Sequence, residues 1–89
     1  MTYKIEITES ANKALNKLSK KEQQKIEEKI ESLIENPRPD GYKKLQASKN
    51  PSLYRIRSED YRIIYTIKQE VLVILVVEIG HRKDIYKSL

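Results

Sequence analysis

Three strand-like segments follow one another in the second half of the chain with almost no sequence between them. Residues 53–58 and 61–67 alternate apolar and polar side chains with a period of two, and residues 71–79 are apolar on both faces. The turns at residues 59–60 and 68–70 are too short for the crossover that a parallel pair of strands requires. The three segments must therefore form an antiparallel meander, and the doubly apolar strand belongs inside the sheet.

The first half of the chain adds one strand and two helices. Residues 3–7 alternate apolar and polar side chains, which predicts a half-buried strand. Ser10 is the expected N-cap of a short amphipathic helix, and the Ser19–Glu22 capping box begins a second helix. Two prolines and a glycine in residues 36–41 end that helix, because proline donates no backbone hydrogen bond. The two helices are therefore expected to form a hairpin with one apolar side.

We expect a two-layer α+β fold in the order β-α-α-β-β-β. The first strand is placed beside the last, which gives an antiparallel four-stranded sheet in the order 1-4-3-2, covered on one face by the helical hairpin. A chain of 89 residues is the size of one domain, so residues 1–89 are treated as a single unit. Residues 42–52 are expected to form a polar loop that carries lysines.

The charge is unevenly distributed along the chain. Residues 1–40 hold eight basic and eight acidic side chains, whereas residues 41–89 hold ten basic and five acidic ones. The whole net charge of +5 therefore lies in the second half. A basic surface of this kind favours a polyanionic partner such as nucleic acid, although a lysine-rich surface can also serve solubility alone.

The residue types that are missing exclude several classes of protein. Without cysteine the chain cannot build a disulfide scaffold, a thiolate zinc site or a thiol nucleophile. No apolar run approaches the about 20 residues of a membrane helix, and the first strand leaves no room for a signal peptide, so we expect a cytoplasmic protein without membrane contact. The strands carry no cluster of carboxylates, and the helix carboxylates alternate with lysines, so no metal or other cofactor is expected.

Arginines gather on one face of the predicted meander. If Glu59-Asp60 is a two-residue turn, Arg57 faces Arg62 on the uncovered side of the sheet, with Arg55 next to them. Like charges that face each other across strands cost about 0.2–1 kcal/mol, so this pair suggests a clamp for phosphate, whose oxygens match guanidinium donors. The alternative is that these arginines simply point into water, where salt screens their repulsion.

The residues that follow the last strand add candidate chemistry. Gly80 permits a sharp exit from the sheet, and the ordinary pKa of a histidine such as His81 is near neutrality, so this side chain could transfer a proton. An isolated exposed histidine is more often idle than catalytic. Tyr86 is either a core anchor or a platform on which a base stacks.

These segments together resemble the RelE/ParE toxin superfamily over nearly the whole chain. The resemblance is carried by the order of the elements, by Asn36-Pro37-Arg38, and by residues 53–57, 60–65 and 79–86. It implies the toxin of a type II toxin–antitoxin system. RelE-like members bind the ribosomal A site and cut messenger RNA there without a metal, whereas ParE-like members inhibit DNA gyrase on nearly the same fold.

The RelE-like interpretation implies a role for each candidate residue. Arg62 matches the arginine that stabilises the transition state, Arg82 the arginine near the leaving group, and Tyr86 the tyrosine that orients a base or assists the 2′-hydroxyl. The residues expected to contact RNA are Arg55, Arg57, Lys43, Lys44, Lys49 and Lys83. The best-known pattern has lysines on the strand that carries Arg55 and Arg57, and arginine is a poor proton acceptor, so His81 becomes the candidate for proton transfer.

We therefore expect a metal-independent endoribonuclease that cuts messenger RNA on the ribosome. The expected partners are the ribosome, its messenger RNA and a RelB-like antitoxin that is helical or disordered until bound. A ParE-like gyrase inhibitor without nuclease activity is the alternative. A binding module that has lost catalysis is a third reading of the same residues.

Overall fold

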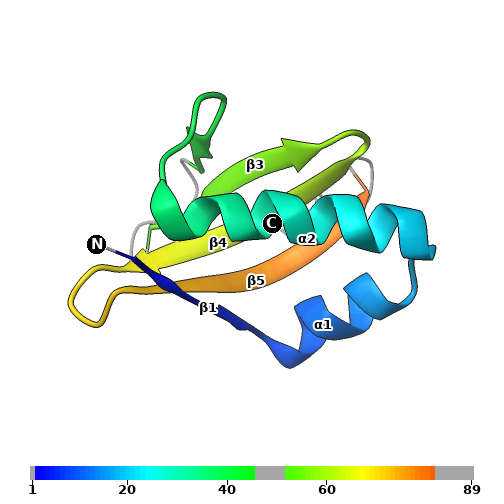
Figure 1. Cartoon of the computed structure of the whole chain (residues 1–89), viewed down its shortest axis with the longest axis horizontal. Coiled ribbons are helices and arrows are strands. Elements are labelled where there is room, and N and C mark those ends of the chain that lie inside the picture. The colour runs from blue at the N-terminus through cyan, green and yellow to red at the C-terminus, as the bar shows by residue number, and fades with distance from the viewer. Residues whose placement is uncertain (1, 46–51, 82–89) are drawn as a thin grey trace.

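Two helices lie across one face of a five-stranded sheet in the computed structural model, which describes residues 2–45 and 52–81 (Figure 1). The elements along the chain are β1 (Lys4–Ile7), α1 (Glu9–Asn16), α2 (Lys20–Glu35), β2 (Lys43–Lys44), β3 (Tyr54–Ser58), β4 (Tyr61–Lys68) and β5 (Val73–His81). The strand order across the sheet is β1-β5-β4-β3-β2. The two-layer arrangement and the antiparallel meander of β3, β4 and β5 agree with the sequence.

The expected antiparallel four-stranded sheet in the order 1-4-3-2 is wrong, because the observed sheet is mixed and has a fifth strand. β1 lies beside β5, as expected, but runs parallel to it, with Lys4 opposite Val73 and Ile7 opposite Val76. Backbone bonds from Lys4 N to Leu72 O (2.8 Å) and from Thr8 N to Val76 O (2.9 Å) hold this edge. Short turns determine direction only within the meander. β1 reaches β5 through both helices and three strands, a connection long enough for either direction.

The fifth strand, β2, lies within the segment expected to be a loop. Lys43 pairs with Arg55 and Lys44 with Tyr54, and a bond from Leu45 N to Leu53 O (2.8 Å) continues the ladder. Two residues are too few to show a period of two, so the sequence pattern could not reveal this strand.

The sequence predicted the start of α2 correctly but misplaced the start of α1. The Ser19–Glu22 capping box of α2 is confirmed, with Glu22 N donating to Ser19 Oγ (3.2 Å) and Ser19 N to Glu22 Oε1 (3.4 Å). The N-cap of α1 is Thr8 rather than Ser10: its Oγ1 accepts from Ala11 N (3.2 Å) and donates to Val77 O (3.1 Å). The helix therefore begins directly where β1 ends.

The core lies between the helices and the sheet. The helices contribute Ala11, Leu15, Ile26, Ile30 and Leu33, and the strands Ile56, Ile63, Tyr65, Ile74, Val76 and Ile79. Tyr65 is fully buried, and its hydroxyl donates to Pro37 O (2.7 Å), which ties the end of α2 to the middle of β4. Burial raises the pKa of Tyr65, so this hydroxyl remains a donor. Neither described helix is long and apolar enough to cross a membrane.

Candidate functional site

The predicted facing pair of arginines is confirmed by the register of β3 and β4. Arg57 lies opposite Arg62, and the flanking pairs Ile56–Ile63 and Ser58–Tyr61 lead into the turn at residues 59–60. Because Ile56 and Ile63 belong to the core under the helices, alternation places Arg57 and Arg62 on the other face of the sheet. Two guanidinium groups therefore leave neighbouring strands from the same side.

The turn that sets this register is itself held in place. Glu59 adopts a left-handed backbone conformation, with φ of 57°, and its carboxylate forms an ion pair with Lys25 of α2. The pair is partly exposed, so its own contribution to stability is small. It nevertheless links the tip of the β3–β4 hairpin to the helical layer.

The face that carries the arginines is less open than the sequence suggested. Arg57 is exposed, but Arg62 is only 7% exposed and Arg55 only 5%. Further along β4 on this face, Ile64 and Thr66 are also buried, and Thr66 Oγ1 donates to Ser52 O (2.8 Å) from the segment that precedes β3. The expectation that this side is uncovered is therefore wrong at these positions. Alternation predicts which face a side chain takes, but segments without periodicity decide whether that face is covered.

The sequence pattern did not predict two features next to the arginine pair, the positions of Gly80 and Glu78 in β5. Gly80 lies inside β5, opposite Arg62, so it does not form the exit from the sheet; it leaves the neighbouring position without a side chain. Glu78 lies opposite Ile64 and is half-buried on the same face as Arg62. A register shift between Ile64 and Tyr65 inserts an extra residue on β5 and changes which of its side chains face the arginines.

The two lysines of β2 divide between the faces of the sheet. Lys43 lies opposite Arg55 and shares its face, whereas Lys44 lies opposite Tyr54 and takes the helix side. Both are exposed. The structure therefore brings Lys43, but not Lys44, to the face of the arginines.

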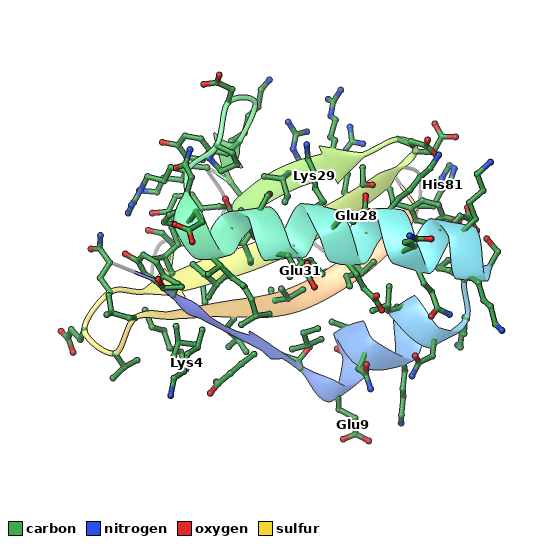
Figure 2. All side chains as sticks on the ribbon, in the orientation of Figure 1. Lys4, Glu9, Glu28, Lys29, Glu31 and His81 are labelled. Carbon is green, nitrogen blue, oxygen red and sulfur yellow. The ribbon has the colours of Figure 1, made fainter. Side chains whose placement is uncertain are left out.

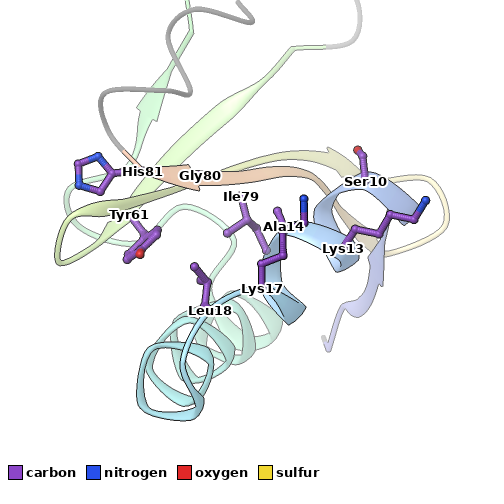
Figure 3. Close-up of a pocket in the computed structure, with 9 residues that line it drawn as sticks. All are labelled: Ser10, Lys13, Ala14, Lys17, Leu18, Tyr61, Ile79, Gly80 and His81. Atoms are coloured by element: carbon purple, nitrogen blue, oxygen red, sulfur yellow. The ribbon is translucent and has the colours of Figure 1, made fainter.

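His81 lies on the opposite side of the sheet from Arg62. It pairs in register with Tyr61, and the two rings meet edge to face with 5.7 Å between their centroids. Figure 3 shows both rings at one end of a cavity of about 500 Å³, which is also lined by Lys13 of α1 and by Lys17, the C-cap of that helix. The sequence placed His81 and Arg62 in one site, but the structure separates their side chains.

A carboxylate joins this second cluster. Hydrogen bonds from Tyr61 and then Ser19 lower the pKa of Glu22, and the positive field of His81 adds a smaller effect in the same direction. The same contact with Glu22 is the main cause of a raised pKa at Tyr61. The N-terminus of α2 is thus coupled to the ends of β4 and β5.

Replacing Tyr61 with phenylalanine is expected to raise the pKa of Glu22 toward its usual value. A carboxylate with a depressed folded pKa stabilises the fold above its unfolded pKa, and this contribution is lost as pH falls through the folded pKa. The stability difference between the variant and the parent should therefore shrink as the solution is acidified. NMR titration of the Glu22 carboxyl carbon measures the shift, with Tyr42→Phe as the matched control. An unchanged Glu22 titration in Tyr61→Phe would show that the hydroxyl does not contact it.

Several predicted residues are not placed by the structure. Lys49, Arg82, Lys83 and Tyr86 lie outside the described residues. Across residues 2–45 and 52–81, no group of three or more histidine, cysteine, aspartate or glutamate side chains is arranged to hold a metal ion.

Comparisons with known proteins agree with the fold. A family model described as the ParE toxin of the type II toxin–antitoxin system parDE matches residues 5–86. One chain of the archaeal RelE–RelB complex from Pyrococcus horikoshii OT3 is 31% identical, with 94% of this chain and 99% of that chain covered and a TM-score of 0.80. The isolated E. coli RelE toxin is 28% identical, with coverages of 97% and 93% and a TM-score of 0.75. The intact E. coli RelBE complex is also 28% identical, with coverages of 89% and 95% and a TM-score of 0.75. Among curated proteins no sequence matches.

Proposed function

This chain belongs to the RelE/ParE superfamily of toxins from type II toxin–antitoxin systems, and we propose that it is a metal-independent endoribonuclease that cuts messenger RNA on the ribosome. The observation that carries the proposal is the facing pair Arg57 and Arg62 on the side of the sheet away from the helices. Like charges in this position do not serve stability, and guanidinium groups match the geometry of phosphate oxygens.

The reaction that suits these residues needs no protein nucleophile. The ribose 2′-oxygen attacks the adjacent phosphorus, a P–O bond to the 2′-oxygen forms, and the bond to the 5′-oxygen breaks. The products are a 2′,3′-cyclic phosphate and a 5′-hydroxyl, so one proton leaves the 2′-hydroxyl and one reaches the departing 5′-oxygen. What the protein must supply is alignment of the 2′-oxygen and stabilisation of the negative charge on the phosphorane oxygens.

Arg62 is the residue to which we assign charge stabilisation. It is nearly buried, so its guanidinium is held more rigidly than that of an exposed arginine, and its charge acts through a medium less polar than water. Exposed Arg57 is assigned to the incoming phosphate, and Arg55 and Lys43 add positive potential on the same face. We assign different roles to Arg62 and Arg57 because Arg62 is nearly buried and Arg57 is exposed.

The remaining roles rest on the family resemblance. We assign Arg82 to the leaving group and Tyr86 to base stacking or the 2′-hydroxyl, and Lys49 and Lys83 to the RNA backbone. The side chain of His81 points to the helix side, beside Tyr61, so the geometry supports the arginine pair more directly than proton transfer by His81 at the same phosphate. The proposed mechanism is therefore mainly electrostatic.

The proposed partner is a RelB-like antitoxin. The Pyrococcus and E. coli relatives were solved as complexes of RelE with RelB. The basic excess of this chain suits an acidic segment that folds as it binds.

The match to the ParE family model supports a second candidate, a gyrase inhibitor that binds without catalysis. The two functions predict different damage in the same experiment. A translated message is incubated with ribosomes and the purified toxin, and primer extension maps any new 5′-ends, while plasmid DNA with gyrase is assayed for strand breaks in parallel. Cleavage within the A-site codon supports the nuclease. Gyrase-dependent breaks with an intact message support the ParE-like function. If neither the message nor the plasmid is cut, the protein is a binding module without either activity.

A further inference from the structure

In residues 2–45 and 52–81, no strand covers the edge of the sheet next to the arginine pair. The bond from Leu45 N to Leu53 O shows that the backbone of Leu53 points toward β2, and every second residue along β3 does the same, so the N–H and C=O of Arg57 also point to this side. Within the described part of the chain, β2 reaches only as far as Lys43, opposite Arg55. It stops there because Gly41, with φ of 89°, turns the chain out of line.

A cavity of about 390 Å³ occupies this open edge. Among the described residues, its lining includes Lys29, Lys43, Arg55 and Arg57 together with one carboxylate, that of Asp40. Lys29 is exposed and comes from α2, on the side of that helix that faces β3 (Figure 2). The cavity thus joins both layers, and four cationic side chains of its described lining lie along the edge to which the Arg57 amide points. Cationic side chains and an outward-pointing amide that line one cavity form an arrangement suited to an anion.

The wall that carries Asp40 and Lys43 is braced by aromatic contacts. The Tyr42 ring packs on Tyr54 with centroids 5.9 Å apart, and the Arg38 guanidinium lies 5.8 Å from the centre of the Tyr54 ring. A hydrogen bond from Tyr42 N to Pro39 O (3.1 Å) closes the turn over residues 39–42, which contains Asp40. These contacts hold the cavity wall in place before any ligand arrives, which reduces the ordering cost of binding.

We propose that this edge cavity binds a backbone phosphate of the RNA strand, next to the phosphate held by Arg57 and Arg62. The ligand class rests on the proposed function; the anion site rests on the cavity itself. Phosphate is favoured over a protein carboxylate because donors of three different kinds line the cavity or point to its edge, and such a set suits a group with several oxygens. They are the ammonium of Lys29, the guanidinium of Arg57 and the Arg57 amide. The Asp40 carboxylate limits the affinity, so the site orients a strand that is already bound.

The test uses two variants that remove the same charge from the same helix. Lys29→Ala changes the cavity, whereas Lys21→Ala removes an exposed lysine eight residues earlier, about 12 Å away along the helix axis. The probe is a single-stranded RNA hexamer with 2′-O-methyl groups, which cannot be cut by the proposed reaction. Lys29→Ala is expected to weaken its binding about two- to fivefold and to reduce the salt slope by about 0.7, while Lys21→Ala changes neither. Equal effects of the two variants would overturn the site, because they would indicate general attraction only.

A second measurement locates the ligand. Titration with inorganic phosphate is expected to shift the Arg57 amide resonance in a saturable manner, and Asp40→Asn is expected to lower the phosphate concentration at half-saturation. A saturable shift with a pentaglutamate peptide but not with phosphate would overturn the proposal and assign the cavity to an acidic protein segment. Neither probe requires cleavage. If the protein binds phosphate but does not cut RNA, the anion site stands and the nuclease function is rejected. If the protein cuts RNA but the Arg57 amide does not respond to phosphate, the nuclease function stands and the anion site is rejected.

Discussion

The Arg62→Ala variant is expected to cleave ribosome-bound message about 100- to 1,000-fold more slowly than the parent protein. That range is the usual cost of removing one fixed donor from the developing charge of a transition state. Arg62 suits this role because it is 7% exposed, faces Arg57 across the strands and has Gly80 rather than a larger side chain on its other side. The measurement is single-turnover cleavage at the A site with toxin in excess.

Two further variants make this result specific. Arg62→Lys keeps the positive charge but loses the paired planar donors, so we expect it to recover only part of the lost rate. Lys68→Ala removes an exposed cation from the end of the same strand and should leave the rate within about twofold of the parent. If Arg62→Ala keeps the parent rate, or if Lys68→Ala loses as much, the arginine pair is not the catalytic clamp.

Burial of Arg62 makes a folding control necessary. Truncating a nearly buried side chain can destabilise the domain, and lost activity would then report unfolding rather than chemistry. The thermal melting curve of each variant should therefore be recorded under the conditions of the assay. A fall in cleavage at a temperature where the variant is fully folded assigns the effect to the site.

The placement of Arg57 opposite Arg62 was predictable because it depends on local sequence alone. A two-residue turn and the alternation on either side of it determine which residues face each other, and the structure has this register. The Ser19 capping box was predictable for the same reason. Where a feature depends on a few neighbouring residues, the sequence contained the information.

The errors arose where distant parts of the chain meet. The direction of β1 depends on how the helices return the chain to the sheet, and the exposure of Arg62 depends on what covers a face. The irregularity beside Tyr65 changed the phase of β5 and brought Glu78 to the arginine face. None of these follows from periodicity. The pairing of Tyr61 with His81 has the same origin, because the extra residue on β5 shifts the register so that Tyr61 lies opposite His81 rather than Gly80.

The second large effect is expected in the core directly behind the arginine pair. Ile63 is fully buried and lies between Ile56 and Ile79 in the register of the sheet. Ile63→Ala removes this packing and should cost about 2–5 kcal/mol of unfolding free energy. A domain of this size is stabilised by only about 5–15 kcal/mol, and each kcal/mol shifts its melting temperature by about 4–8 °C.

Denaturant unfolding and thermal melting measure this cost, with Val71→Ala as the control. Val71 is 62% exposed in the turn before β5, so its truncation should change the unfolding free energy by less than about 0.5 kcal/mol. Ile63→Val, which removes one methylene, should cost about 0.5–1.5 kcal/mol. If Ile63→Ala melts like Val71→Ala, then Ile63 is not packed between the helices and the sheet. The assignment of Arg62 to the opposite face would fall with it, since neighbouring residues of a strand point to opposite sides.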